Sequence, residues 1–120
     1  MRLALVVAMS VFFSSASLAG EADVTGVVVK QTSSGAFRFD VTVLHADAGW
    51  DHYANKWDVV APNGDVIDTR ILHHPHDNEQ PFTRSFTTDK IPSDLSHVII
   101  RAHDSIHEYG GAEMKVELPR

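Results

Sequence analysis

Histidine is the residue type that could do chemistry in this chain, which has eight histidines and no cysteine among its 120 residues. Seven of the eight form three groups along the sequence: His45 and His52; His73, His74 and His76; His103 and His107. Imidazole is the commonest protein ligand for transition metals, and it also titrates near neutral pH. The histidines therefore predict a metal site or a pH-sensitive surface, provided that the fold brings the groups together.

Composition narrows the chemistry further. The lack of cysteine excludes thiolate-ligated copper, iron–sulfur and cysteine-type zinc sites, whereas imidazole-rich sites suit copper(II) and zinc. The chain has 16 acidic and 10 basic residues, a formal net charge of −6. That balance opposes binding to nucleic acid or to anionic lipid and favours cations.

The amino terminus has the features of a secretory signal peptide over residues 1–19. Arg2 provides the positive start, Leu3–Phe13 an apolar stretch, and Ser17–Ala19 the small residues that a signal peptidase prefers. The alternative is a retained membrane anchor, but the apolar stretch is short for a bilayer span. No cysteine follows the stretch, so a lipoprotein anchor is not expected. We expect a periplasmic or secreted domain of residues 20–120, with no stable membrane insertion after cleavage.

Short runs of β-branched and aromatic residues, each closed by a turn signal, recur along residues 20–120. In the run Phe37–His45, apolar residues alternate with polar ones, which is the period of a half-buried strand. Pro62–Asp65 contains Asn-Gly, a strong hairpin signal. The runs lie at about 24–30, 37–45, 56–61, 66–72, 82–87, 97–103 and 114–118. We predict one all-β domain, a seven-stranded immunoglobulin- or fibronectin-III-like β-sandwich with Trp57 in its core. A small closed barrel is the alternative.

Antiparallel strands in succession would place the loops alternately at the two ends of such a sandwich. Loops 46–55, 73–81 and 104–113 then share one end, and every grouped histidine lies in or beside one of them. His97 belongs to the opposite end. Asp51 and Asp104 could orient the imidazole rings by accepting from their second nitrogen. The predicted metal ligands are His45, His52, His74, His76, His103 and His107.

Each of these features also has a simpler interpretation. The spacing from His103 to His107 resembles the HExxH motif of zinc proteases with Asp in place of Glu, but that motif requires a helix. Here it follows the strand-like run 98–102. Trp50 and Tyr53 could form an aromatic wall around a ligand with Trp57, but core and loop packing is the favoured reading. Arg84 could pair with an acidic neighbour, Glu79 or Asp77.

Three stretches resemble a family of small exported proteobacterial proteins with no established activity. They are HADAGWDHYANKW at 45–57, HPHDNEQPFTRS at 74–85 and RAHDSIH at 101–107, the last followed by Gly110-Gly111. The resemblance implies that the six predicted ligands are motif residues, and that His73 is less clearly one. It also leads us to expect glycine where Glu108 stands.

A looser resemblance links the chain to superoxide reductases, whose iron is bound on an immunoglobulin-like sandwich. His52-Tyr53, followed by Trp57, is similar to their His-Tyr-x-x-Trp segment. Their iron requires an axial cysteine, which this chain lacks, so the resemblance implies an architecture that can hold histidine ligands and excludes that activity.

These observations favour a periplasmic protein that carries, buffers or delivers copper(II) or zinc, with the ion passed to a periplasmic metalloprotein or transporter. The second hypothesis is a pH-responsive, immunoglobulin-like module that binds a protein or ligand without metal. The third is a metal-dependent redox or hydrolytic enzyme, for which no nucleophile–base spacing is visible.

Overall fold

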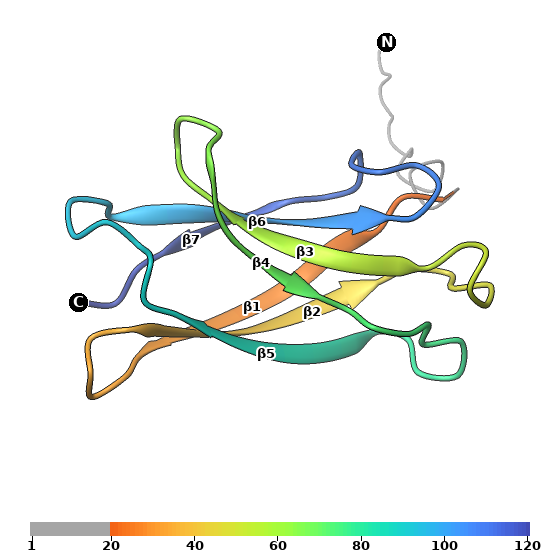
Figure 1. Cartoon of the computed structure of the whole chain (residues 1–120), viewed down its shortest axis with the longest axis horizontal. Coiled ribbons are helices and arrows are strands. Elements are labelled where there is room, and N and C mark those ends of the chain that lie inside the picture. The colour runs from red at the N-terminus through yellow and green to blue at the C-terminus, as the bar shows by residue number, and fades with distance from the viewer. Residues whose placement is uncertain (1–19) are drawn as a thin grey trace, which may run out of the picture.

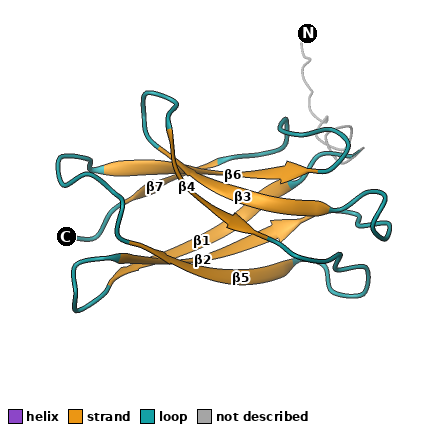
Figure 2. Ribbon diagram, viewed as in Figure 1, coloured by secondary structure: helices purple, strands orange, loops and turns teal. Residues whose placement is uncertain are grey.

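The computed structural model describes residues 20–120; the predicted signal peptide lies outside the described residues. One sheet has three antiparallel strands in the order β1-β2-β5: β1 (Asp23–Gln31), β2 (Phe37–Leu44) and β5 (Phe82–Thr88). The other has four in the order β4-β3-β6-β7: β3 (Ala54–Val60), β4 (Val66–Ile71), β6 (His97–Asp104) and β7 (Met114–Glu117). The sheets face each other as two layers, which confirms an all-β, sandwich-like fold (Figures 1 and 2).

The core fills the space between the two layers and follows from the alternation along the strands. In β2, Phe37, Phe39, Val41 and Val43 are buried, and the residues between them are more exposed. Trp57 on β3 is fully buried and meets Phe86 edge-on, with ring centroids 6.0 Å apart, so its predicted place in the core is confirmed. Burial of such large side chains is the main stabilising contribution in a domain of this size.

The loops gather at two opposite ends of the sandwich, as Figure 2 shows in teal. Strands β2, β4 and β6 all finish at the same end, which we call the histidine rim (Figure 1). It consists of the segments 45–53, 72–81 and 105–113, which connect β2 to β3, β4 to β5 and β6 to β7. No helix within residues 20–120 is long and apolar enough to cross a membrane.

A buried carboxylate on the outer face of β3 anchors the loop that follows β6. Asp58 accepts hydrogen bonds from the Tyr109 hydroxyl at 2.5 Å, Arg101 Nε at 3.2 Å and Thr69 Oγ1 at 2.7 Å. The Arg101 guanidinium also lies 4.0 Å from the centre of the Tyr109 ring. Burial and the hydrogen bond to Asp58 raise the pKa of Tyr109 to about 12. Tyr109 therefore stays a neutral donor that ties its loop to the sheet.

The same loop packs against the chain segment that leads into β1. Val24 N donates to Ala112 O at 2.8 Å, and Ala112 N donates to a carboxylate oxygen of Asp23 at 2.7 Å. Gly111 lies so close that a Cβ built on it would be 2.0 Å from the carbonyl oxygen of Ala22. This contact fixes the start of the described chain beside the histidine rim.

We predict that Gly111→Ala destabilises the protein by about 1–3 kcal/mol, because the added methyl group overlaps backbone that cannot rotate away. The control is Gly26→Ala, whose Cβ would make only ordinary contacts, 3.7 Å from Thr42. That substitution should change the free energy of unfolding by less than about 0.5 kcal/mol. Urea unfolding of both variants measures the difference, and equal effects would contradict the close approach at Gly111.

Candidate metal centre

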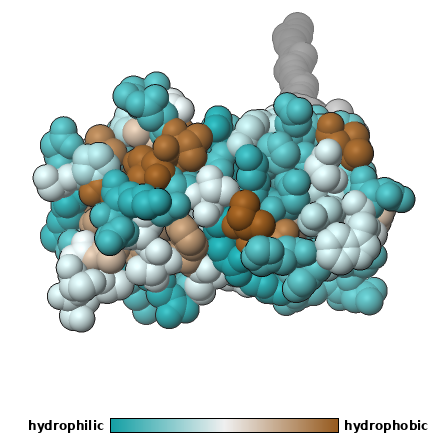
Figure 3. All heavy atoms as spheres, in the orientation of Figure 1, coloured by the Kyte–Doolittle hydropathy of each residue, from teal (hydrophilic) through white to brown (hydrophobic). Residues whose placement is uncertain are grey.

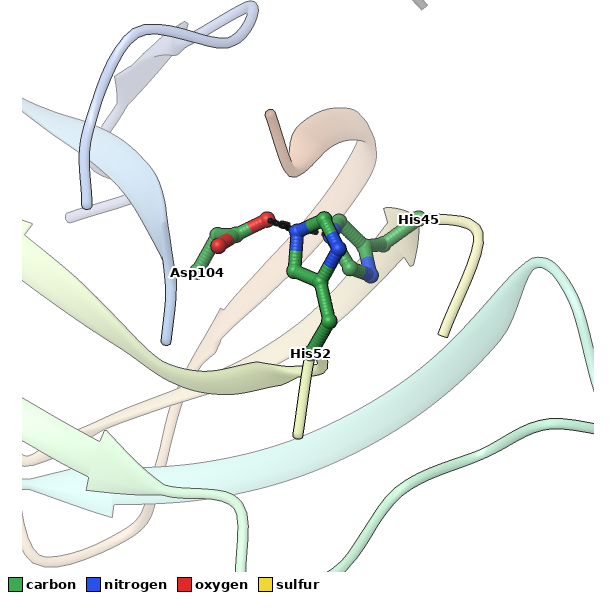
Figure 4. A group of neighbouring side chains, drawn as sticks. All are labelled: His45, His52 and Asp104. Atoms are coloured by element: carbon green, nitrogen blue, oxygen red, sulfur yellow. Dashed lines mark hydrogen bonds and ion pairs between the residues drawn. The ribbon is translucent and has the colours of Figure 1, made fainter. Parts of the chain in front are cut away.

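Two histidines and one aspartate meet between the sheets at the histidine rim. His45 directly follows β2, Asp104 is the last residue of β6, and His52 lies two residues before β3. The group therefore draws on both layers of the sandwich. His45 and Asp104 are buried, and His52 is part-exposed, with its ring turned toward Asp104 (Figure 4).

Asp104 divides its two carboxylate oxygens between the rings and the backbone. Oδ2 lies 2.5 Å from His45 Nε2 and 2.7 Å from His52 Nε2. Oδ1 accepts from the backbone N–H groups of Ile106, at 2.6 Å, and His107, at 2.8 Å. Burial alone would raise the pKa of Asp104, but these backbone and imidazole donors outweigh it and lower the pKa. The group is an ionised carboxylate with no exposed surface.

The imidazole of His45 lies between two carboxylates. Its Nδ1 bonds to Asp47 Oδ1, and its Nε2 faces Asp104 Oδ2 and, at 3.0 Å, the carbonyl oxygen of Gly20. Burial acts to lower the pKa of His45, but the hydrogen bonds with Asp47 and Asp104 outweigh it and raise the pKa. In this arrangement both ring nitrogens donate, so His45 is the imidazolium between two acidic groups.

Asp47 links the group to the other loops of the rim. Its carboxylate is fully buried; Oδ1 also accepts from Ala54 N at 3.1 Å, and Oδ2 accepts from His76 N at 2.6 Å. Gln80 completes the link, because its amide oxygen accepts from His45 N at 2.9 Å and its amide nitrogen donates to His76 O at 3.0 Å. These bonds hold the ring of His45 in one orientation, with Nδ1 toward Asp47.

The three side chains have the chemistry of a metal site. One ligand atom from each of His45, His52 and Asp104 lies within 4.8 Å of the others. Zinc binds imidazole nitrogen and carboxylate oxygen at about 2.0–2.2 Å, so an ion would fit after the carboxylate of Asp104 withdraws from the rings by less than about 1 Å. Asp47 behind His45 gives the carboxylate–histidine–metal arrangement that fixes the tautomer in many metal centres.

His107 lies beside this group on its exposed side. Its ring centroid is 5.0 Å from that of His52. The loop that carries it is closed by reciprocal backbone hydrogen bonds between Asp104 and Glu108, each 2.9 Å. Glu108 has a φ of 61°, in the left-handed region that favours glycine. This backbone conformation gives a physical reason for the glycine that the family resemblance led us to expect where Glu108 stands.

His74 and His76 form a second, separate pair, with ring centroids 5.4 Å apart. His76 is buried and stacks on Phe82 at 4.0 Å, and neither of its ring nitrogens has a hydrogen-bond partner within the described residues. Burial, and then the nearby Arg84, lower its pKa. The pair lines an open cavity of about 550 Å³ together with Trp50 and Arg84. Unlike His45 and His52, these rings do not share a carboxylate oxygen.

The exposed side of that cavity carries two residues that the sequence singled out. Arg84 Nη2 lies 3.2 Å from Glu79 Oε1, so the pairing of Arg84 with Glu79 is confirmed. Trp50 is 66% exposed and meets Tyr53 edge-on at 5.6 Å, so it is not a core residue.

His103 is not brought into the group, although it directly precedes Asp104. Successive residues of a strand point to opposite faces. Its Nδ1 therefore bonds to Asn55 Oδ1 at 2.7 Å, and its ring meets Tyr109 at 4.8 Å, the residue bound to Asp58 on the outer face of β3. Burial, and then Lys56, lower its pKa. The helix that an HExxH-type zinc site requires is absent here, since residues 103–107 form a strand end and a turn.

The six histidines that the sequence predicted as ligands lie in three groups in the structure. These are His45 and His52 with His107 beside them, His74 with His76, and His103 on the outer face. Asp104, expected only to orient a ring, lies at the centre. Asp51 is exposed and is not part of the group. Sequence reasoning missed Gly20 and Gln80. The short spacing of Asp47 from His45 was the available signal for its role.

Comparison with known proteins gives a sequence relative and no match among solved structures. A protein of Halomicrobium mukohataei that carries the name "Putative lipoprotein" is 40% identical over 97 residues, which cover 81% of this chain and 47% of the relative. The chain thus spans about half the length of that relative. No family model matches the chain, and no solved structure matches it significantly.

We predict that His45→Gln destabilises the metal-free protein by about 3–5 kcal/mol, because it leaves two buried carboxylates without a counter-charge. The pKa of His45 lies above its ordinary value of 6.5 in the folded state. The stabilisation that His45 gives the folded state is therefore fully present below pH 6.5. It is lost as the pH rises through the raised pKa of the folded state. Urea unfolding of both proteins with a chelator, across this range, measures the difference. A difference that grows with pH would show that His45 is buried as the neutral ring.

Proposed function

We propose that this protein is an exported metal-binding protein that holds one copper(II) or zinc ion at His45, His52 and Asp104. The observation that carries the proposal is the convergence of two imidazole nitrogens and one ionised carboxylate from both sheets at one buried point. Copper(II) and zinc are the ions best suited to imidazole with carboxylate and without thiolate.

The buried charges support a cation at this point. Asp47 and Asp104 are both buried carboxylates, and one imidazolium, His45, lies between them. Two negative charges therefore face one positive charge. A divalent cation that displaces the proton from His45 Nε2, and binds between that nitrogen and Asp104 Oδ2, would leave the ring neutral and balance the two carboxylates. The bond from His45 Nδ1 to Asp47 would remain in place, as the outer partner of a metal-bound imidazole does.

Access to the site supports carriage, buffering or delivery of the ion. His52 is part-exposed and His107 is exposed, so the ion would be reached from the end of the sandwich without unfolding the core. An ion held at such a rim can pass to a partner protein, and we propose a periplasmic metalloprotein or transporter for this role. The signal-like residues 1–19 support export. The relative is named a putative lipoprotein, which also supports an exported protein, and we propose a periplasmic or secreted location.

The strand order also supports an immunoglobulin- or fibronectin-III-like type of sandwich. Sheets ordered β1-β2-β5 and β4-β3-β6-β7 correspond to strands A-B-E and C′-C-F-G of an immunoglobulin- or fibronectin-III-like sandwich. Trp57 then lies on the C strand, where immunoglobulin domains have their core tryptophan.

We predict saturable binding of one zinc or copper(II) ion, with a rise in melting temperature on metal addition that a chelator reverses. His52→Ala should weaken the affinity at least about tenfold, because it removes a ligand but no core packing. His97→Ala is the matched control, since His97 is also a part-buried histidine but lies at the opposite end of β6. Titration against a chromophoric chelator gives the affinities. Equal affinity in wild type and His52→Ala would overturn the site.

A second candidate function is a pH-responsive binding module without metal. The observation that favours it is a pair of buried histidines in contrasting surroundings: His45 lies between two carboxylates, which raise its pKa, and His76 is stacked on Phe82, where burial lowers its pKa. One observation weighs against a protein partner docked on this face. The face in Figure 3 is largely hydrophilic, and its apolar residues lie in separate patches, unlike a broad apolar docking surface. Association that changes between about pH 5 and 8 in the presence of a chelator would support this function.

A further inference from the structure

The first described residue, Gly20, lies against the candidate metal centre. Its carbonyl oxygen is 3.0 Å from His45 Nε2, the nitrogen that also faces Asp104. On its other side Gly20 touches His107, because a Cβ built on Gly20 would be 2.3 Å from His107 Nε2. A side chain at this position would require the exposed ring of His107 to move aside. Gly20 therefore lies between the buried His45 and the exposed His107.

The chemical nature of the Gly20 nitrogen depends on whether the preceding segment has been removed. In the uncut chain this nitrogen belongs to a peptide bond, and its lone pair is delocalised into the carbonyl group, so the neutral amide nitrogen does not bind zinc. Cleavage after Ala19, where the signal motif ends, would make it a free α-amino group. Covalent geometry keeps that group within about 3.7 Å of the Gly20 carbonyl oxygen, and hence beside the imidazoles.

We propose that the α-amino group of Gly20, freed by removal of the leader, is a further ligand of the metal ion, so that export completes the site. This inference rests on the proposed metal-binding function. The amino nitrogen and carbonyl oxygen of one residue can close a small chelate ring on an ion, which would place the ion next to His45 Nε2 and within reach of His107.

Two features of the fold hold this residue in place for such a role. Close packing of Gly111 on Ala22 and the hydrogen bond between Val24 and Ala112 tie the start of the chain to the loop that carries His107. Figure 1 shows this start at the same end as the loop after β6. A precursor with its leader attached would have only the histidines and Asp104, and would bind the ion more weakly than the exported protein.

The test compares three full-length chains exported through the natural leader. The first is wild type; the second has one glycine inserted between Ala19 and Gly20, which moves the α-amino group one residue away. The third is the matched control, with one glycine added after Arg120, at the end remote from the rim. Intact mass identifies the first residue of each product. Melting with a chelator present checks that the insertions leave the metal-free fold unchanged.

Zinc affinity of each protein and the rate of α-amine acylation with and without zinc are then measured. We expect the amino-terminal insertion to weaken zinc binding at least about tenfold, and the carboxy-terminal control to match wild type. Zinc should slow acylation at Gly20 in wild type. Equal affinities with no protection of the amine, or a wild-type product that does not begin at Gly20, would overturn the inference and leave the proposed function standing. Absence of zinc binding in all three would overturn both.

Discussion

The buried carboxylate of Asp104 joins the two sheets at the histidine rim, and the rest of the site depends on it. Through Oδ2 it contacts His45, which follows β2, and His52, which precedes β3. Through Oδ1 it accepts two backbone hydrogen bonds and so shapes the turn that presents His107. An unpaired carboxylate at this depth would be costly, so the donors around it are a condition of folding as well as of function.

Much of this arrangement could be predicted from the sequence, because it follows from strong local patterns. The alternation of apolar and polar residues in Phe37–His45 indicates a strand, and the Asn-Gly turn at 62–65 indicates a hairpin. Both are properties of residues adjacent in the sequence. Counting antiparallel strands places the loops at alternate ends, so that His107 could be expected near His45 and His52 although it is far from them in the chain. The burial of Trp57 followed from the same strand pattern.

The division of the histidines into separate groups could not be predicted in that way. Loop position says nothing about which face a side chain takes, and strand alternation turns His103 outward toward Asn55 while Asp104 turns inward. The contact of Gly20 with the site depends on the path of the segment before β1, which has no periodic pattern to read. The short spacing of Asp47 from His45 indicates that the two are neighbours, but the ring nitrogen that Asp47 contacts is seen only in the structure.

The most direct test of the metal centre is a crystal structure of the zinc-loaded protein with the ion located by its anomalous scattering. The account predicts one peak bonded to His45 Nε2, His52 Nε2 and an oxygen of Asp104, with Asp47 still hydrogen-bonded to the other nitrogen of His45. A peak at His74 and His76 instead, with the bonds among His45, His52 and Asp104 unchanged, would contradict it.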